Sequence, residues 1–174
     1  MSGQIVPAKD PPAPAQIVAA VDSALALWDA DLAKTSSADL RGMIARAIEA
    51  GKSGQIDTLA FHITNPATRR EISKGVAEML KTFQKRADSE DLETFTLKLC
   101  QDIHSIRPSA PALEMAFTIL RRQSTFRPEI AEVYEAVKSQ AALCDTRAAL
   151  LRRLGGRVLE AGQLLKERGD GAAG

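Results

Sequence analysis

Hydrophobic residues recur every three or four positions along most of the chain, which is the spacing of one face of an α-helix. The first stripe covers residues 16–32 and consists of Ile17, Val21, Leu25, Trp28 and Leu32. A second begins after Ser36, which stands three residues before Asp39 in the arrangement of a helix N-cap. Its apolar positions are Leu40, Met43, Ile44, Ala47 and Ile48. Gly51 is expected to end this helix.

The next segment, residues 54–64, fits two patterns. Ile56, Leu59, Ala60 and Ile63 suit a short helix, whereas Leu59, Phe61 and Ile63 alternate as on a strand. We favour the helix. Asn65 followed by Pro66 then predicts the start of another helix, since Asn caps helices and Pro is tolerated at the first helical position. Its expected buried face is Ile72, Val76, Met79, Leu80 and Phe83.

A further helix is expected to begin near Asp88 or Ser89, because its acidic first turn suits the positive end of the helix dipole. Its expected inward residues are Leu92, Phe95, Leu99, Cys100 and Ile103. Pro108 and Pro111 bracket a turn, after which the stripe Leu113, Ala116, Phe117 and Leu120 predicts a helix that stops within residues 123–125.

Pro128 is expected to open the last apolar run, which continues to Leu165. Gly155 and Gly156 interrupt this run, so either a kink or two separate helices should occur there.

These patterns predict an all-α protein with a single helical domain of about seven or eight helices over residues 16–168. Residues 128–168 are a candidate semi-independent C-terminal part. The Pro-rich start (1–15) and the Gly-rich end (169–174) are expected to be disordered tails.

Composition agrees with a globular helical protein: 174 residues, 45% hydrophobic and 26% charged, with a net charge of +1. Aromatic residues make up only 4%, which argues against a surface that stacks nucleic-acid bases on several rings. With two cysteines, no secretory signal pattern and no apolar stretch of roughly 18 residues, we expect a cytoplasmic protein that does not enter a membrane.

One sequence pattern resembles a nucleotide site. Gly51-Lys52-Ser53 is similar to the end of a phosphate-binding loop, but the earlier glycine of that loop is replaced by Arg46, and the segment follows a helix instead of a strand. A turn that ends a helix is the favoured interpretation.

Cys100 and His104 lie four residues apart and share one helix face, as half of a zinc site or a thiol–imidazole pair would. The other candidate ligands of these types are His62 and Cys144, in distant segments. A buried thiol beside an imidazole at a helix end is favoured, so we expect no metal, no cofactor and no catalysis. A helical enzyme that uses Cys100 and His104 is the alternative from another class.

Basic residues gather in two clusters. The first consists of Arg69, Arg70, Lys74, Lys81, Lys85 and Arg86. The second consists of Arg147, Arg152, Arg153, Arg157, Lys166 and Arg168. Two basic faces could contact phosphates, with an affinity that falls steeply with salt. The alternative is that they are ordinary solvated helix faces.

The segment 106–137 reads as two helices joined by a short turn. We expect Phe126 to fill the core at this turn, Arg127 to point outward and Pro128 to fix the start of the second helix. As a helix-turn-helix, the segment could bind DNA through Arg121, Arg122 and Arg127, although the turn lacks glycine.

The same segment resembles small phage and prophage replication proteins of proteobacteria. In those proteins a Pro-initiated helix that ends in paired basic or polar residues leads into a Phe-x-Pro-x-x-x-Glu element, here Phe126-Arg127-Pro128-Glu129-Ile130-Ala131-Glu132. The resemblance implies an accessory that recruits or loads a replicative helicase and has no enzyme activity of its own. The N-terminal half of the chain does not match that pattern.

We therefore expect a non-catalytic accessory protein of a DNA-linked process, most concretely phage-type replication, acting by protein contacts with non-specific DNA contact. The expected contact residues are Arg69, Arg70, Lys74, Lys81, Lys85, Arg121, Arg122, Arg127, Arg152, Arg153 and Arg157. The alternative is a DNA-binding regulator or packaging-type subunit that forms homo-oligomers through its C-terminal helix.

Overall fold

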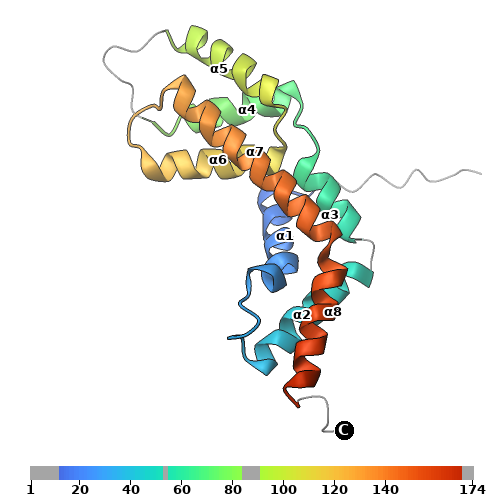
Figure 1. Cartoon of the computed structure of the whole chain (residues 1–174). Helices are drawn as coiled ribbons and strands as arrows, with labels where there is room; N and C mark the ends of the chain where they lie inside the picture. Colours follow the sequence, from blue (N-terminus) through green and yellow to red (C-terminus); the bar gives the residue numbers. More distant parts are fainter. Residues whose placement is uncertain (1–11, 53–54, 84–90, 170–174) are drawn as a thin grey trace, which may run out of the picture.

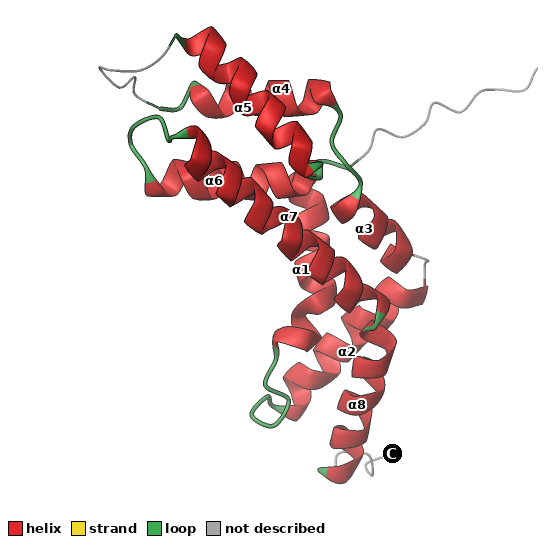
Figure 2. Cartoon of the chain, turned by 45° about the horizontal axis from the view of Figure 1, so that its top comes forward, coloured by secondary structure: helices red, strands yellow, loops and turns green. Residues whose placement is uncertain are grey.

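The computed structural model describes residues 12–52, 55–83 and 91–169, which form eight α-helices. In chain order these are α1 (Pro14–Asp29), α2 (Ser37–Lys52), α3 (Gln55–Thr64), α4 (Arg69–Leu80), α5 (Leu92–Ile106), α6 (Ala110–Gln123), α7 (Ile130–Arg152) and α8 (Leu154–Glu167). The predicted all-α class is confirmed (Figure 2). None of these helices is both long enough and apolar enough to cross a membrane.

The helices enclose two hydrophobic cores. Core 1 joins α1, α2, α3, α8 and the second half of α7, and its most buried large side chains are Leu27, Leu40, Ile63, Leu151 and Leu154. Core 2 joins α4, α5, α6 and the first half of α7, and its most buried large side chains are Ile72, Val76, Met79, Leu99 and Ile103.

Helix α7 passes through both cores. Val133 and Val137 belong to core 2, and Cys144, Ala148 and Leu151 belong to core 1. In Figure 1 the bundle of α4, α5 and α6 lies at one end of α7, and the pair α2 and α8 lies beyond the other end. The predicted C-terminal part, residues 128–168, thus contributes to both cores.

The N-terminal helices follow the predicted pattern with shifted ends, except that Ile48, expected on the apolar stripe of α2, is 41% exposed because it lies at the edge of that stripe. Helix α1 begins at Pro14, inside the predicted tail, and ends at Asp29, so Leu32 is buried from a loop instead of from the helix. At α2 the hydroxyl of Ser36 accepts a hydrogen bond from the N–H of Asp39 (3.2 Å), which confirms the predicted cap. Helix α2 extends through Lys52, one residue past the predicted end. Residues 55–64 are helical, as favoured.

The predicted start of α4 at Asn65-Pro66 is wrong. The helix begins at Arg69, because Thr68 and Glu71 form a capping box: the Thr68 hydroxyl accepts from the N–H of Glu71 (3.2 Å) and the Glu71 carboxylate accepts from the N–H of Thr68 (2.7 Å). These bonds lower the pKa of the Glu71 carboxyl. The N–H of Ala67 donates to the carbonyl of Pro108 (2.8 Å), so this linker is extended and joins the α5–α6 turn.

Helix α5 begins at Leu92, and the Asp91 carboxylate accepts from the N–H of Thr94 (3.4 Å). The expected start at Asp88 or Ser89 lies outside the described residues. Leu92, expected to point inward, is 50% exposed, because it lies in the first turn, ahead of the stripe that packs against α4 and α7.

The last three helices begin and end close to the predicted positions. Ser109 caps α6, which stops at Gln123 as predicted. Helix α7 begins two residues after Pro128, where the Glu132 carboxylate accepts from the N–H of Glu129 (2.7 Å). It ends at Arg152, and α8 begins at Leu154 with both glycines in its first turn, so the two-helix alternative is the one observed.

The α6–α7 turn reverses the expected roles of two neighbouring residues. Phe126 is 50% exposed, whereas Arg127 is only 7% exposed and its guanidinium carbon lies 4.2 Å from the ring centre of Phe95. A guanidinium is planar and weakly hydrated, so it can stack on an aromatic face while its aliphatic stem packs in the core. Both predictions for this turn, and Arg127 as a DNA contact, are therefore wrong.

Substituting Arg127 should therefore destabilise the protein more than substituting its aromatic neighbour. Arg127→Ala is expected to lower the free energy of unfolding by about 2 kcal/mol, because it removes the contact with Phe95 and leaves a gap beside the ring. Phe126→Ser should change it by less than about 0.5 kcal/mol. Chemical denaturation of both variants checks the order, and a larger loss in the Phe126 variant would contradict it.

Candidate functional site

The first predicted basic cluster lies on the outer face of α4. All four described cations are exposed: Arg70 and Lys74 lie on the side of α4 away from the buried stripe of core 2, Lys81 lies at its C-cap, and Arg69 lies on the side that meets α5. Lys85 and Arg86 lie outside the described residues. The predicted basic face therefore persists over α4, where four cations are accompanied by Glu71 and Glu78.

A groove between α4 and α6 brings together Lys74 of the first basic cluster and Arg121 of the predicted helix-turn-helix. The other side chains that line it include Glu71, Glu78 and Glu114. Arg121 donates to the Glu114 carboxylate (3.3 Å) and to the Thr118 hydroxyl (3.1 Å). With three carboxylates against two cations, this groove does not favour a phosphate.

The floor of the same groove depends on a close helix contact. A Cβ placed on Gly75 would lie 3.1 Å from Cε2 of Phe117, which is tighter than an ordinary van der Waals contact. Gly75, in the middle of α4, therefore lets α6 approach closely. This contact fixes α4, and with it the exposed cations of that helix, at the edge of core 2.

Two arginines of the second cluster, Arg157 and Arg168, face into the protein. The Arg157 side chain donates to the carbonyls of Leu27 and Ala30 (both 3.2 Å), pairs with Glu160 (2.7 Å) and lies over the Trp28 ring, 5.4 Å from its centre. Cations near the last carbonyls of a helix are favoured by the helix dipole, and here Arg157 serves the end of α1. Arg157, predicted as a contact residue, therefore uses its donors inside the fold.

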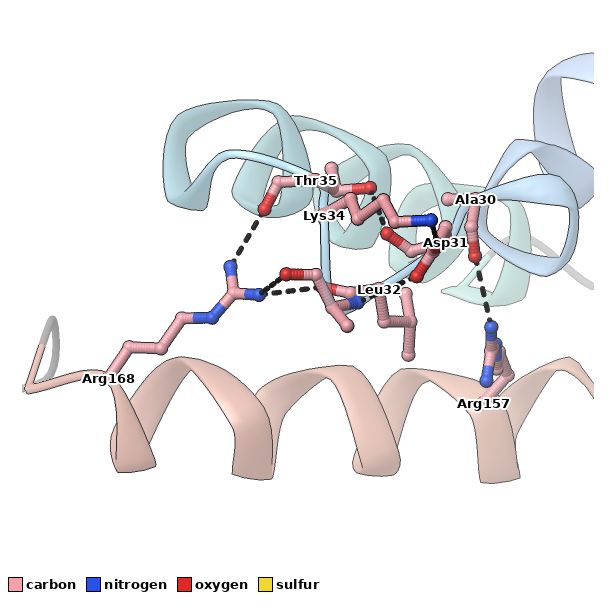
Figure 3. A network of polar contacts seen from close by, with 8 residues as sticks. Ala30, Asp31, Leu32, Lys34, Thr35, Arg157 and Arg168 are labelled. Atoms are coloured by element: carbon pink, nitrogen blue, oxygen red, sulfur yellow. Dashed lines mark hydrogen bonds and ion pairs between the residues drawn. The ribbon is translucent and has the colours of Figure 1, made fainter.

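Arg168, one residue beyond α8, holds the loop that joins α1 and α2. Its guanidinium donates to the carbonyls of Leu32 (2.7 Å), Ala33 (2.9 Å) and Thr35 (2.7 Å). Figure 3 shows Arg157 and Arg168 reaching from the α8 side toward this loop. We call these two residues the arginine clamp.

The remaining arginines of the two C-terminal helices divide between internal and external roles. Arg147 forms an ion pair with Asp22 (3.0 Å) and so ties α7 to α1. Arg152 and Arg153, at the junction of α7 and α8, are exposed as expected, and so is Arg122 in the last turn of α6.

The Cys100–His104 pair is directed toward α4. The Cys100 thiol interacts with the Ser73 hydroxyl, and its burial raises the pKa of the thiol, which disfavours the nucleophilic thiolate. His104 accepts a hydrogen bond from Nε of Arg69 (3.4 Å). Burial also raises the pKa of Cys144. Within the described ranges no three residues of metal-binding type come together.

The phosphate-loop interpretation also finds no support in the geometry. Gly51 and Lys52 form the end of α2, as the favoured interpretation of a helix-ending segment expected, and Ser53 lies outside the described residues.

Sequence reasoning missed the four exposed leucines of the described residues, Leu92, Leu97, Leu143 and Leu159. Leu97 is 61% exposed on α5, Leu159 is 70% exposed on α8, and Leu92 was expected inward. The spacing of the sequence indicated the exposure of two of them. Leu97 lies two residues from both Phe95 and Leu99, so it falls outside the inward stripe of α5. Leu159 likewise falls outside the stripe that runs through Val158 and Leu165.

No family model matches this sequence, and its comparison with curated proteins and with solved structures gives no match in either.

Removal of Arg168, one of the two residues of the arginine clamp, should loosen the α1–α2 loop. Arg168→Ala is expected to lower the free energy of unfolding by about 1–3 kcal/mol, because three carbonyls lose a charged donor. It should also speed amide hydrogen exchange in residues 31–36. Arg168→Lys should recover little, since an ammonium cannot reproduce the fork of a guanidinium. Lys166→Ala, an exposed neighbour, is the control, and equal effects of the two alanine variants would refute the clamp.

Proposed function

We propose that this chain is a non-catalytic accessory protein of a DNA-linked process, such as phage-type replication, that acts mainly by protein contacts. The observation that carries the proposal is the contrast between two sets of side chains. Arg127 of the α6–α7 turn and Arg157 and Arg168 of the second basic cluster are used inside the fold. Large aliphatic side chains, by contrast, are left exposed on outer helices.

The exposed aliphatic side chains support a function that depends on contacts with other proteins. Leu92 and Leu97 both line one open depression on α5, so they form a continuous apolar surface instead of isolated positions. Apolar surface of this kind, rimmed by polar residues, is typical of sites that bind other proteins.

Contact with DNA, where it occurs, is assigned to α4. Arg69, Arg70, Lys74 and Lys81 are exposed on that helix, and the carboxylate of Glu71 is already occupied by the capping box with Thr68. Contacts of this type carry no sequence information and are screened by salt.

A replicative helicase is the protein partner that we propose. Support comes from the sequence resemblance over residues 106–137 and from the α6–α7 turn, where the half-exposed Phe126 offers an aromatic anchor beside the rigidly held Arg127. Aromatic side chains are enriched among the residues that dominate protein interfaces.

Charge reversal on α4 tests the DNA contact. The triple variant Arg70→Glu, Lys74→Glu and Lys81→Glu should bind duplex or single-stranded DNA at least about tenfold more weakly, and the slope of log affinity against log salt should fall by about 3, roughly one for each lost phosphate contact. Fluorescence anisotropy with labelled DNA over a range of salt concentrations measures both quantities.

The matched control carries the same change of charge at Lys34, Arg46 and Lys138, which are exposed in the α1–α2 loop, on α2 and on α7. Equal loss in the control would mean that net charge, not the α4 face, attracts DNA. Binding to a purified replicative helicase, with Phe126→Ser as the interface variant, tests the partner separately. No binding of the wild type would overturn the helicase assignment.

A further inference from the structure

One uncovered apolar surface lies on α5. Its depression is lined by Ser73 of α4 and by Asp91, Leu92, Glu93, Thr96, Leu97 and Cys100. Because Ser73 and Cys100 line it, the depression lies beside the contact of α5 with α4, and among the described residues it is open on its outer side. Two carboxylates and no basic side chain are present among the lining residues, which makes this apolar surface negative at its rim.

A second exposed surface lies on α8, with cations at both ends and the carboxylates of Glu160 and Glu167 along one side. Gly156, Leu159, Gln163 and Lys166 follow one another at the spacing of a single helix face, and all are exposed. Arg152 and Arg153 precede this stripe and are exposed as well. A Cβ placed on Gly155 or Gly156 would meet no atom within 4 Å, so no contact inside the chain requires glycine there.

We propose that these two surfaces bind each other between copies of this chain: the α8 face of one molecule docks on the α5 face of the next. Leu159 would lie between Leu92 and Leu97, and the cations of Arg152 and Arg153 would face the carboxylates of Asp91 and Glu93. Each surface has an exposed leucine at its centre, and the Arg152–Arg153 end of one complements the Asp91–Glu93 end of the other in charge, as in a specific helix-in-groove contact.

The two surfaces cannot meet within one molecule. Figure 1 shows α5 and α8 at opposite ends of α7, which separates them by the length of a 23-residue helix. The contact is therefore heterologous, and head-to-tail association of this type gives chains or closed rings instead of a symmetric dimer. This inference goes beyond the proposed function, because it requires neither DNA nor a helicase.

The test uses the full chain with one surface damaged at a time. By sedimentation velocity the wild type should form species larger than a dimer as its concentration rises. Leu97→Asp and Leu159→Asp should each be monomeric. An equimolar mixture of the two variants should form a dimer of two 18.7 kDa chains and nothing larger, because only one intact pair of surfaces remains. Leu143→Asp, at an exposed leucine of α7, is the control and should associate like the wild type.

Charge exchange provides the second measurement. Arg153→Glu and Glu93→Lys should each weaken association at least about tenfold, and the double variant that carries both changes should recover it, because every contact then contains the exchanged pair. Circular dichroism of each variant must show unchanged helix content.

Three outcomes would overturn the proposal. The first is a wild type that stays monomeric at its highest soluble concentration. The second is association that survives Leu97→Asp, as a symmetric contact through α8 alone would. The third is a mixture of the two leucine variants that stays monomeric while the wild type associates. DNA binding that persists in any of these cases would leave the proposed function standing.

Discussion

The passage of α7 through both cores is the constraint on which the rest of the structure depends. Val133 and Val137 pack in core 2, and Cys144, Ala148 and Leu151 of the same helix pack in core 1. Because a continuous helix is stiff over this length, the two cores keep a fixed relation to each other. The direction of α7 also sets where α8 lies. Because α8 follows the C-terminal end of α7, it packs against α2, and the arginine clamp contacts the α1–α2 loop.

Arginine side chains make many of the polar and ring contacts that connect the helices of this protein. With aromatic residues at only 4%, few rings are available, and two of them, Phe95 and Trp28, have a guanidinium on their face. Backbone carbonyls that helix ends leave unpaired receive the donors of Arg157 and Arg168. Charge that looks available for phosphates in the sequence is therefore partly used inside the fold. The predicted contact residues that remain outside include those of the α4 face, Arg122 and the α7–α8 junction.

Sequence reasoning predicted the helices well, because periodic burial is a property of each helix separately. It failed where two local signals compete. Asn65-Pro66 and Thr68-Glu71 are both start signals, and the second forms because the N–H of Ala67 bonds to Pro108, a residue far along the chain. For the candidate site, sequence reasoning found the cations of α4 but not the exposed leucines of α5 and α8. A search for inward-facing stripes identifies buried positions only, so it gives no information about apolar residues that lie outside the stripes.

The sequence by itself determined the all-α class, the stripes that become buried and most of the residues that begin the helices, since these depend on neighbours within about four positions. Only the tertiary structure decided which of Phe126 and Arg127 turns inward and which arginines stay free. The reason is that their partners lie far away in sequence: Arg127 meets Phe95, and Arg157 meets Leu27. A side chain in a turn, or a long charged one, takes its direction from rings and carbonyls that only packing brings near.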